Sequence, residues 1–136
     1  MLIKEFISET NKNQMISILL KHYRVSGVKV KQKSMKDHAH YNVDTGTLEL
    51  STRYKTIKSS QIKQFLITII HEIYHAMDAK KYGWRRFKGD YEWEMNYQIS
   101  QGKDEYKDNK YEIAAEKFGQ KNYIKWYNKF KKDNLF

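Results

Sequence analysis

The apolar positions along the chain follow two spacings, and each spacing predicts a different kind of element. In residues 2–22 the apolar side chains recur at roughly helical intervals with a polar interruption, which predicts one or two short helices. In residues 27–54 they alternate with polar side chains, and Asp44-Thr45-Gly46 separates two β-prone runs as a hairpin turn would. We therefore predict three short strands between about residues 27 and 54.

The strongest helical pattern follows these strands. It begins at Ser59 or Ser60, either of which can cap a helix, and apolar residues then recur every three or four positions up to Met77. This helix should end near Tyr82-Gly83, where glycine can close it. A polar, aromatic-rich segment comes next, in which residues 91–100 are predicted to form a short helix.

A final helix completes the predicted unit. Asn109 stands three residues before Glu112, a spacing typical of a helix start, and the helix is expected to continue to residue 132. With 136 residues, no proline and no internal repeat, the chain fits a single domain, residues 1–136, with a modest core. The order helix, small sheet, helix, loop, helix is typical of an α+β fold.

Composition narrows the chemistry that this domain can carry. The chain has no cysteine, so a transition-metal site must use His, Asp or Glu. The longest apolar run, Phe65–Ile70, is far shorter than the roughly 18–20 residues that cross a bilayer, and the start of the chain does not resemble a signal peptide. We therefore expect a cytoplasmic protein that does not enter a membrane.

The chain is basic, with 26 Lys and Arg against 16 Asp and Glu and a net charge of +10, and such a charge attracts nucleic acid and other anions. Few of the basic residues are arginine, whereas base readout and stacking favour arginine, so a generic basic surface is the favoured interpretation. Residues 84–93 interleave cations with aromatic rings, as surfaces that clamp phosphates and stack bases do. The same segment also suits a loop that covers the core, and we favour that interpretation.

The strongest helix carries His71, Glu72 and His75 near its end, in the sequence H-E-I-Y-H. At about 100° per residue, the two histidines lie roughly 40° apart on one helix face, and Glu72 lies beside them. This is the HExxH signature of zinc-dependent peptidases, and the apolar stripe of the helix lies on its other side. The motif predicts a Zn²⁺ site with His71 and His75 as ligands and Glu72 as general base.

No histidine follows the motif, so families with a downstream histidine ligand are disfavoured and a carboxylate must complete the site. Glu112 lies in the sequence E-I-A-A-E, which resembles the E-x-x-x-D or E-x-x-A pattern of the gluzincins. That resemblance implies that Glu112 is the third ligand and that Glu116, one turn later, braces a ligand histidine. Ala115 and Gly119 are small enough to let the last helix approach the histidine helix closely.

Alternatives for single residues stay open. Glu112 could be only the acidic half of a capping box at the start of the last helix. Asp78 shares the stripe of the histidines, but it lies roughly 10 Å along the helix axis from His71, so contact with a ligand or with substrate fits it better than coordination. His38 and His40, on one face of a β-prone segment, are expected to be surface or cleft residues.

The gluzincin resemblance also implies a reaction and a substrate geometry. Gluzincins hydrolyse peptide bonds with a metal-activated water, and a Tyr or His often stabilises the oxyanion; Tyr123, on the Glu112 face of the last helix, is our candidate. The segment Gly46–Ser51 resembles an edge strand that pairs with an extended protein or peptide substrate. Over about residues 46–125, the chain is similar to minimal gluzincins and to small HExxH proteins of phages and mobile elements.

We therefore expect a single α+β, zincin-like domain with the activity of a gluzincin-like zinc endopeptidase. A small antiparallel-edged sheet should pack on the active-site helix and on a C-terminal helix that bears the glutamate ligand. Two alternatives remain open. One is a nucleic-acid-binding module with a structural or idle metal site, and the other is a metal-dependent interaction protein that binds a partner without cleaving it.

Overall fold

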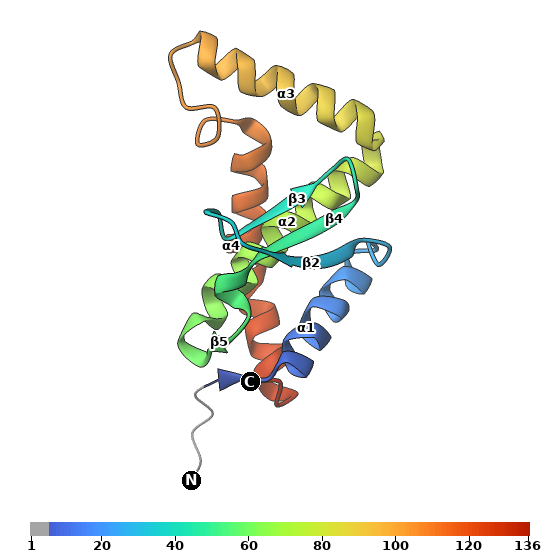
Figure 1. Ribbon diagram of the computed structural model, residues 1–136, viewed down its shortest axis with the longest axis vertical. Coiled ribbons are helices and arrows are strands. Elements are labelled where there is room, and N and C mark those ends of the chain that lie inside the picture. Colours follow the sequence, from blue (N-terminus) through green and yellow to red (C-terminus); the bar gives the residue numbers. More distant parts are fainter. Residues whose placement is uncertain (1–5) are drawn as a thin grey trace.

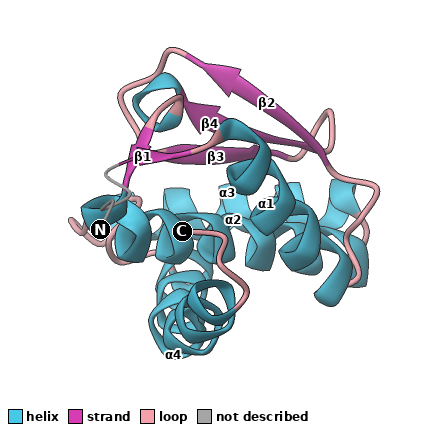
Figure 2. Cartoon of the chain, turned by 90° about the horizontal axis from the view of Figure 1, so that it is seen from below, coloured by secondary structure: helices cyan, strands magenta, loops and turns pink. Residues whose placement is uncertain are grey.

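A three-stranded sheet lies on one side of a long helix, and a second long helix lies on the other side (Figures 1 and 2). The computed structural model describes residues 6–136, and they form the expected α+β fold. The strands are β1 (Phe6–Ile7), β2 (Lys29–Lys33), β3 (Ala39–Asn42), β4 (Thr47–Ser51) and β5 (Ile57–Lys58), and the helices are α1 (Glu9–His22), α2 (Ile62–Tyr82), α3 (Trp84–Ser100) and α4 (Lys110–Lys132). Among the described residues, no helix is both long and apolar enough to cross a membrane.

The helix α2 is the centre of the core. Phe65, Ile69 and Ile73 of its predicted apolar stripe are fully buried against side chains of α1, β4 and α4, and Met77 at the end of the stripe is partly buried. The helix follows a 3₁₀ turn at Ser59–Gln61 and ends, as predicted, at Gly83, whose φ of 85° lies in the region that favours glycine. Because α3 begins at the next residue, this glycine is where the chain changes direction.

The N-terminal region contains one of the one or two short helices predicted in residues 2–22, preceded by a strand. Helix α1 covers Glu9–His22, and Ser8 caps it by accepting a 3.1 Å hydrogen bond from the backbone of Asn11. Phe6–Ile7 is a strand, because it pairs antiparallel with β5 through a contact far away in the sequence. Residues 2–5 of the predicted range lie outside the described part of the chain.

The sheet has the three predicted strands in the order β2-β4-β3. The antiparallel hairpin of β3 and β4 is confirmed, with Ala39 opposite Leu50 and Asn42 opposite Thr47. Strand β2 pairs parallel to the other side of β4, so one edge of the sheet is antiparallel and the other is parallel. The prediction that Gly46–Ser51 forms an edge strand is therefore wrong, because β4 is the central strand and β3 is the edge beside α2.

The segment 84–93 is helical, not the loop that we favoured. Helix α3 runs without interruption over Trp84–Ser100, and its inner face buries Phe87 and Glu94. The apolar pattern missed the first half of this helix because polar side chains occupy much of the inner face. On its outer side, the guanidinium carbon of Arg85 lies 5.1 Å from the ring centre of Trp84.

Helix α4 has the predicted start and length. Asn109 caps it by accepting a 2.9 Å hydrogen bond from the backbone N–H of Tyr111. Its inner face packs along α2, with Ala115, Trp126 and Phe130 buried. This packing places the first turn of α4 against the middle of α2, where the two histidines lie.

Candidate metal centre

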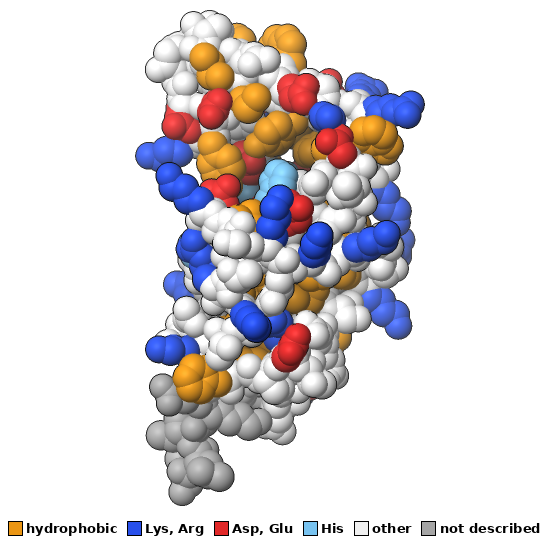
Figure 3. Space-filling model, in the orientation of Figure 1, with side chains coloured by type: hydrophobic (Ala, Val, Ile, Leu, Met, Phe, Trp, Pro, Cys, Tyr) orange, Lys and Arg blue, Asp and Glu red, His pale blue; other side chains and the backbone are white. Residues whose placement is uncertain are grey.

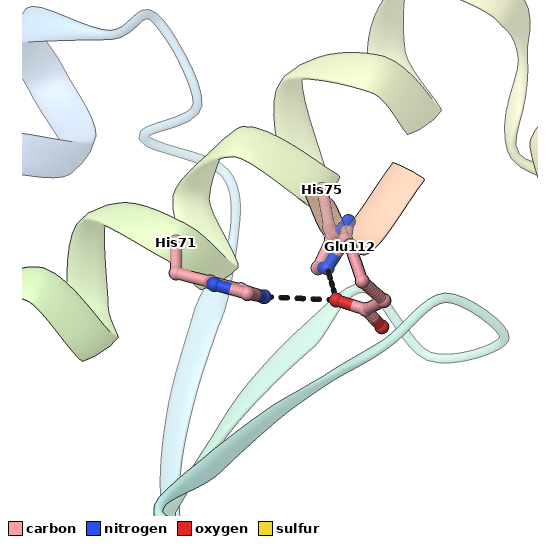
Figure 4. Close-up of side chains that lie close together, drawn as sticks. All are labelled: His71, His75 and Glu112. Carbon is pink, nitrogen blue, oxygen red and sulfur yellow. Dashed lines mark hydrogen bonds and ion pairs between the residues drawn. The ribbon is translucent and has the colours of Figure 1, made fainter. Parts of the chain in front are cut away.

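The two histidines of the H-E-I-Y-H sequence point from α2 towards the same oxygen atom. The Nε2 atom of His71 lies 2.8 Å from Oε1 of Glu112, and the Nε2 atom of His75 lies 2.7 Å from that oxygen (Figure 4). One helical turn separates the two rings, so both reach the same side of α2. All three residues are buried, with 6–7% of their surface exposed.

Glu112 reaches the histidines because α4 approaches α2 closely at the next turns. Ala115 is fully buried, and a Cβ atom added at Gly119 would lie 2.9 Å from the backbone oxygen of Ile67. The same Cβ atom would lie 3.7 Å from the backbone nitrogen of His71. A side chain at position 119 would therefore push the two helices apart, as the small residues in the sequence suggested.

The other ring nitrogens of the two histidines have different surroundings. Nδ1 of His71 lies 2.9 Å from Oε2 of Glu116, so Glu116 lies where the gluzincin resemblance implied. Nδ1 of His75 is buried and has no hydrogen-bond partner among the described residues. Asp78, three residues after His75 in α2, does not join the donor group and does not bond to this nitrogen; burial raises its pKa, and the charge of His75 opposes that rise.

Both oxygens of Glu112 are engaged by the cluster. Oε1 faces the two histidines, and Oε2 accepts a hydrogen bond from the hydroxyl of Tyr91 in α3. The cap of α4 is the side chain of Asn109, as described above. The carboxylate of Glu112 therefore serves this cluster, and the capping-box alternative is not needed to explain its position.

The carboxylates set the charge of the cluster. Burial alone would lower the pKa of His71, but the hydrogen bond to Glu112 and the charges of Glu72 and Glu112 outweigh burial and raise this pKa to about 9. Burial alone would raise the pKa of Glu112, but hydrogen bonds from His71 and His75 hold it well below its usual range. The site thus favours a negative carboxylate opposite positive charge, and a divalent cation can supply that charge.

The donor set suits a divalent metal ion. Two imidazole nitrogens and one carboxylate oxygen lie within 4.8 Å of one another. Two histidines and a glutamate form a known ligand set of catalytic zinc, and a carboxylate on the other ring nitrogen fixes which nitrogen faces the metal. Glu116 provides that carboxylate for His71. The residues therefore fit Zn²⁺, and the same donors also accept other first-row metals.

Glu72 lies beside the donor atoms. Its Oε1 lies 4.0 Å from Nε2 of His71, and its Oε2 accepts a 3.0 Å hydrogen bond from the backbone N–H of Tyr41 in β3. Burial raises the pKa of Glu72 to about 7, although the charges of His75 and His71 lower it. A carboxyl group with such a pKa can accept and release a proton near neutral pH, as a general base must.

The cluster lies in a cleft of about 890 Å³ between β3 and α3. Figure 3 shows a histidine surface in a hollow between hydrophobic side chains on one side and charged side chains on the other. His38 and His40 line the β3 wall of this cleft without joining the donor set. Across the cleft, Lys88 of α3 forms a 2.9 Å ion pair with Asp44 of the hairpin turn.

The chain was compared with protein-family models, with curated proteins and with solved structures, and none of them matches. The gluzincin resemblance, which concerns two short motifs, therefore stays a prediction. The donor set, its burial and the cleft around it are the observations from which a function can be inferred.

Two tyrosines of the cleft were not identified from the sequence. The hydroxyl of Tyr91 contacts Glu112, and Tyr106, in the loop before α4, lines the cleft. The chain has 11 tyrosines, so neither composition nor spacing singled out these two. Their positions depend on the course of α3 and of the loop that follows it.

Tyr123, our candidate for stabilising the oxyanion, lies elsewhere. Its ring packs against the hydrophobic core, and the ammonium group of Lys63 lies 5.3 Å from the ring centre. Tyr123 shares the inner face of α4 with Glu112 but follows it by three turns, roughly 16 Å along the helix axis. The prediction for Tyr123 is therefore wrong, because two residues on the same face of a helix can still lie far apart along the helix axis.

Proposed function

We propose that the protein is a zinc-dependent metallopeptidase of the gluzincin type that acts on extended protein or peptide segments. The convergence of His71 Nε2, His75 Nε2 and Glu112 Oε1 inside a cleft carries this proposal. These three residues would hold the zinc ion, with Glu72 beside it. Bound zinc would lower the pKa of its water and polarise a carbonyl oxygen.

Glu72 is the residue that moves protons in this proposal. The N–H of Tyr41 holds Oε2, and Oε1 is the oxygen that faces His71. Oε1 accepts the proton of the attacking water and later delivers it to the leaving nitrogen of the peptide. Burial raises the pKa of Glu72, which makes this carboxylate a stronger proton acceptor, and a cation bound beside it would lower the same pKa.

The outer edge of β3 supports an extended substrate. The backbone N–H of Tyr41 is directed away from β4 and towards Glu72. Because successive residues of a strand alternate in direction, the backbone groups of Ala39 are expected on the same outer edge. Because the N–H of Tyr41 is engaged by Glu72, an extended peptide would add to this edge through other main-chain groups, such as those of Ala39. Strand β3 thus takes the role that we had predicted for Gly46–Ser51.

Tyr106 takes the place of Tyr123 as the candidate for stabilising the oxyanion. It lines the cleft with 53% of its surface exposed, and partial desolvation together with the charges of Glu112 and Glu72 raises its pKa, so its hydroxyl keeps its proton. A protonated phenol can donate a hydrogen bond to the charge that develops on a carbonyl oxygen.

Replacing Glu72 by Gln tests this proposal, because the change removes the base and keeps the ligands. We expect Glu72→Gln to retain zinc and to lose about 10²–10⁴-fold in the rate of peptide hydrolysis. The measurement is mass spectrometry of a library of unstructured peptides, with zinc content as the second readout. The control is Glu9→Gln on the exposed start of α1, which should cleave like the wild type. Cleavage by Glu72→Gln at the wild-type rate would contradict the proposal.

A binding protein with an idle metal site is the alternative. The outer face of α4 carries exposed Lys117, Lys121 and Lys125 at intervals of four residues, and none of the described ion pairs includes them. Such a row of charges attracts phosphates. Binding of duplex DNA that survives removal of the metal, together with no peptide hydrolysis by the zinc-loaded protein, would favour this alternative.

The other alternative is a protein that binds a partner without cleaving it. Such a protein would keep its biological effect in the Glu72→Gln variant. A cytoplasmic location stays a prediction.

A further inference from the structure

The two carboxylate oxygens of Glu112 have different partners. Oε1 lies 2.8 Å from Nε2 of His71 and 2.7 Å from Nε2 of His75. Oε2 accepts the hydrogen bond of the Tyr91 hydroxyl. A phenol has one hydrogen to donate, and in this contact it is committed to Oε2. Glu112 therefore presents a single oxygen to the point where the two imidazole nitrogens converge.

The packing around Tyr91 holds its hydroxyl in this position. Its ring centre lies 6.2 Å from that of His75, with the two rings nearly perpendicular at 88°, and 6.0 Å from that of Tyr111. Helix α3 is itself fixed to the start of α4, because buried Glu94 accepts a 2.8 Å hydrogen bond from the backbone N–H of Lys110. Tyr91 and Glu112 are therefore held in place by two helices that are joined near the site.

We propose that Tyr91 is a positioning residue that restricts Glu112 to coordination of the metal through one oxygen, and that it thereby preserves a position for water. This inference rests on the proposed metal site and identifies which atoms of the chain bind there. A carboxylate can bind a cation through one oxygen or through both. Catalytic zinc keeps three protein ligands and one position for water, and a released Oε2 would be an additional ligand that crowds that position.

The hydroxyl of Tyr91 can be separated from its ring. Tyr91→Phe keeps the contacts with the rings of His75 and Tyr111 and removes only the hydrogen bond to Oε2. A matched control is Tyr111→Phe, which removes a hydroxyl from the neighbouring ring, because the hydrogen bonds found at the donor atoms do not involve Tyr111. If Tyr91 served packing alone, the two variants would bind metal in the same way.

The test is the visible absorption of Co²⁺ added to the metal-free protein, because four-coordinate Co²⁺ absorbs several-fold more strongly than five- or six-coordinate Co²⁺. We expect the strong spectrum for the wild type and for Tyr111→Phe. We expect a several-fold weaker spectrum for Tyr91→Phe, with Oε2 of Glu112 as the added ligand. Circular dichroism shows whether each variant is folded.

Several outcomes would overturn the inference. One is a folded Tyr91→Phe protein with the cobalt spectrum of the wild type. Another is a wild-type spectrum typical of five- or six-coordinate Co²⁺, and this outcome can be measured without any variant. A wild type that binds neither Co²⁺ nor Zn²⁺ would overturn both this inference and the proposed metal site. The expected spectra combined with no peptide cleavage would support the role of Tyr91 and contradict the peptidase proposal alone.

Discussion

His71 lies between Glu112 and Glu116, and these carboxylates favour a proton on its ring. Its pKa is raised from 6.5 to about 9, because the hydrogen bond to Glu112 and the charges of Glu72 and Glu112 outweigh the lowering by burial. A metal ion must displace this proton to bind Nε2. We therefore expect the zinc affinity to increase with pH, by up to about tenfold per pH unit below pH 9, and to level off above it.

Calorimetric titration with a competing chelator measures this dependence, and buffers with different heats of ionisation report the released proton. Glu116→Gln is the matched variant, because it removes one of the groups that raise the pKa of His71. Its affinity curve should shift towards lower pH. A zinc affinity that stays constant between pH 6.5 and pH 9 would contradict this account.

The spacing in the sequence predicted some site residues but not others, and helix geometry explains the difference. His71 and His75 converge because four residues of a helix fix their relative direction. Glu112 and Glu116 came from the resemblance of a second motif, since no local rule relates α4 to α2. The position of Tyr91 depends on the course of α3, and the apolar pattern predicted only the second half of that helix.

At the scale of elements, the contact between α2 and α4 decides whether the donor atoms meet. Gly119→Ala would place a Cβ atom 2.9 Å from the backbone oxygen of Ile67, which cannot move without shifting α2. Such overpacking costs roughly 1–3 kcal/mol, and the higher helix propensity of alanine offsets about 1 kcal/mol of it, so we expect the free energy of unfolding to fall by up to about 2 kcal/mol. We also expect weaker zinc binding, because the shift moves Glu112 away from His71. Urea unfolding and chelator competition measure the two effects.

Gly89→Ala is the control for this prediction. Gly89 lies inside α3, and a Cβ atom there would meet nothing within 4 Å. Alanine favours helix over glycine by about 1 kcal/mol, so this variant should be slightly more stable and should bind zinc like the wild type. A Gly119→Ala protein as stable as Gly89→Ala would show that the helices do not need their close approach.

The strands show how far local patterns extend. The β3–β4 hairpin was predicted because its turn, Asp44-Thr45-Gly46, and its alternating side chains lie together in the sequence. The central position of β4 was missed because it depends on parallel pairing with β2, in which the paired residues are 18 positions apart in the sequence. Alternation of apolar and polar side chains predicts that a segment is a strand, but it does not predict which strands pair with it in the sheet. The identity of the edge strand, and with it the expected substrate position, therefore required the structure.

At the scale of the whole molecule, the excess of basic charge does not come from the part of the chain that carries most of the site. Residues 72–116 contain 10 acidic and 8 basic residues, whereas the rest of the chain contains 6 acidic and 18 basic residues. The α+β class was predicted from the order of the elements and is confirmed. The distribution of the basic charge along the chain was not predicted, because the composition gives only the net charge.

The most direct test of the metal centre is the zinc content of natively purified protein, measured by elemental mass spectrometry. We expect near-stoichiometric zinc in the wild type and its loss in His75→Ala and in Glu112→Ala, because each change removes one of the three donor atoms. Retention of zinc in Glu112→Ala would contradict the assignment of the third ligand. A wild type that holds no metal, even after zinc is supplied, would contradict the metal centre and the peptidase function proposed for it.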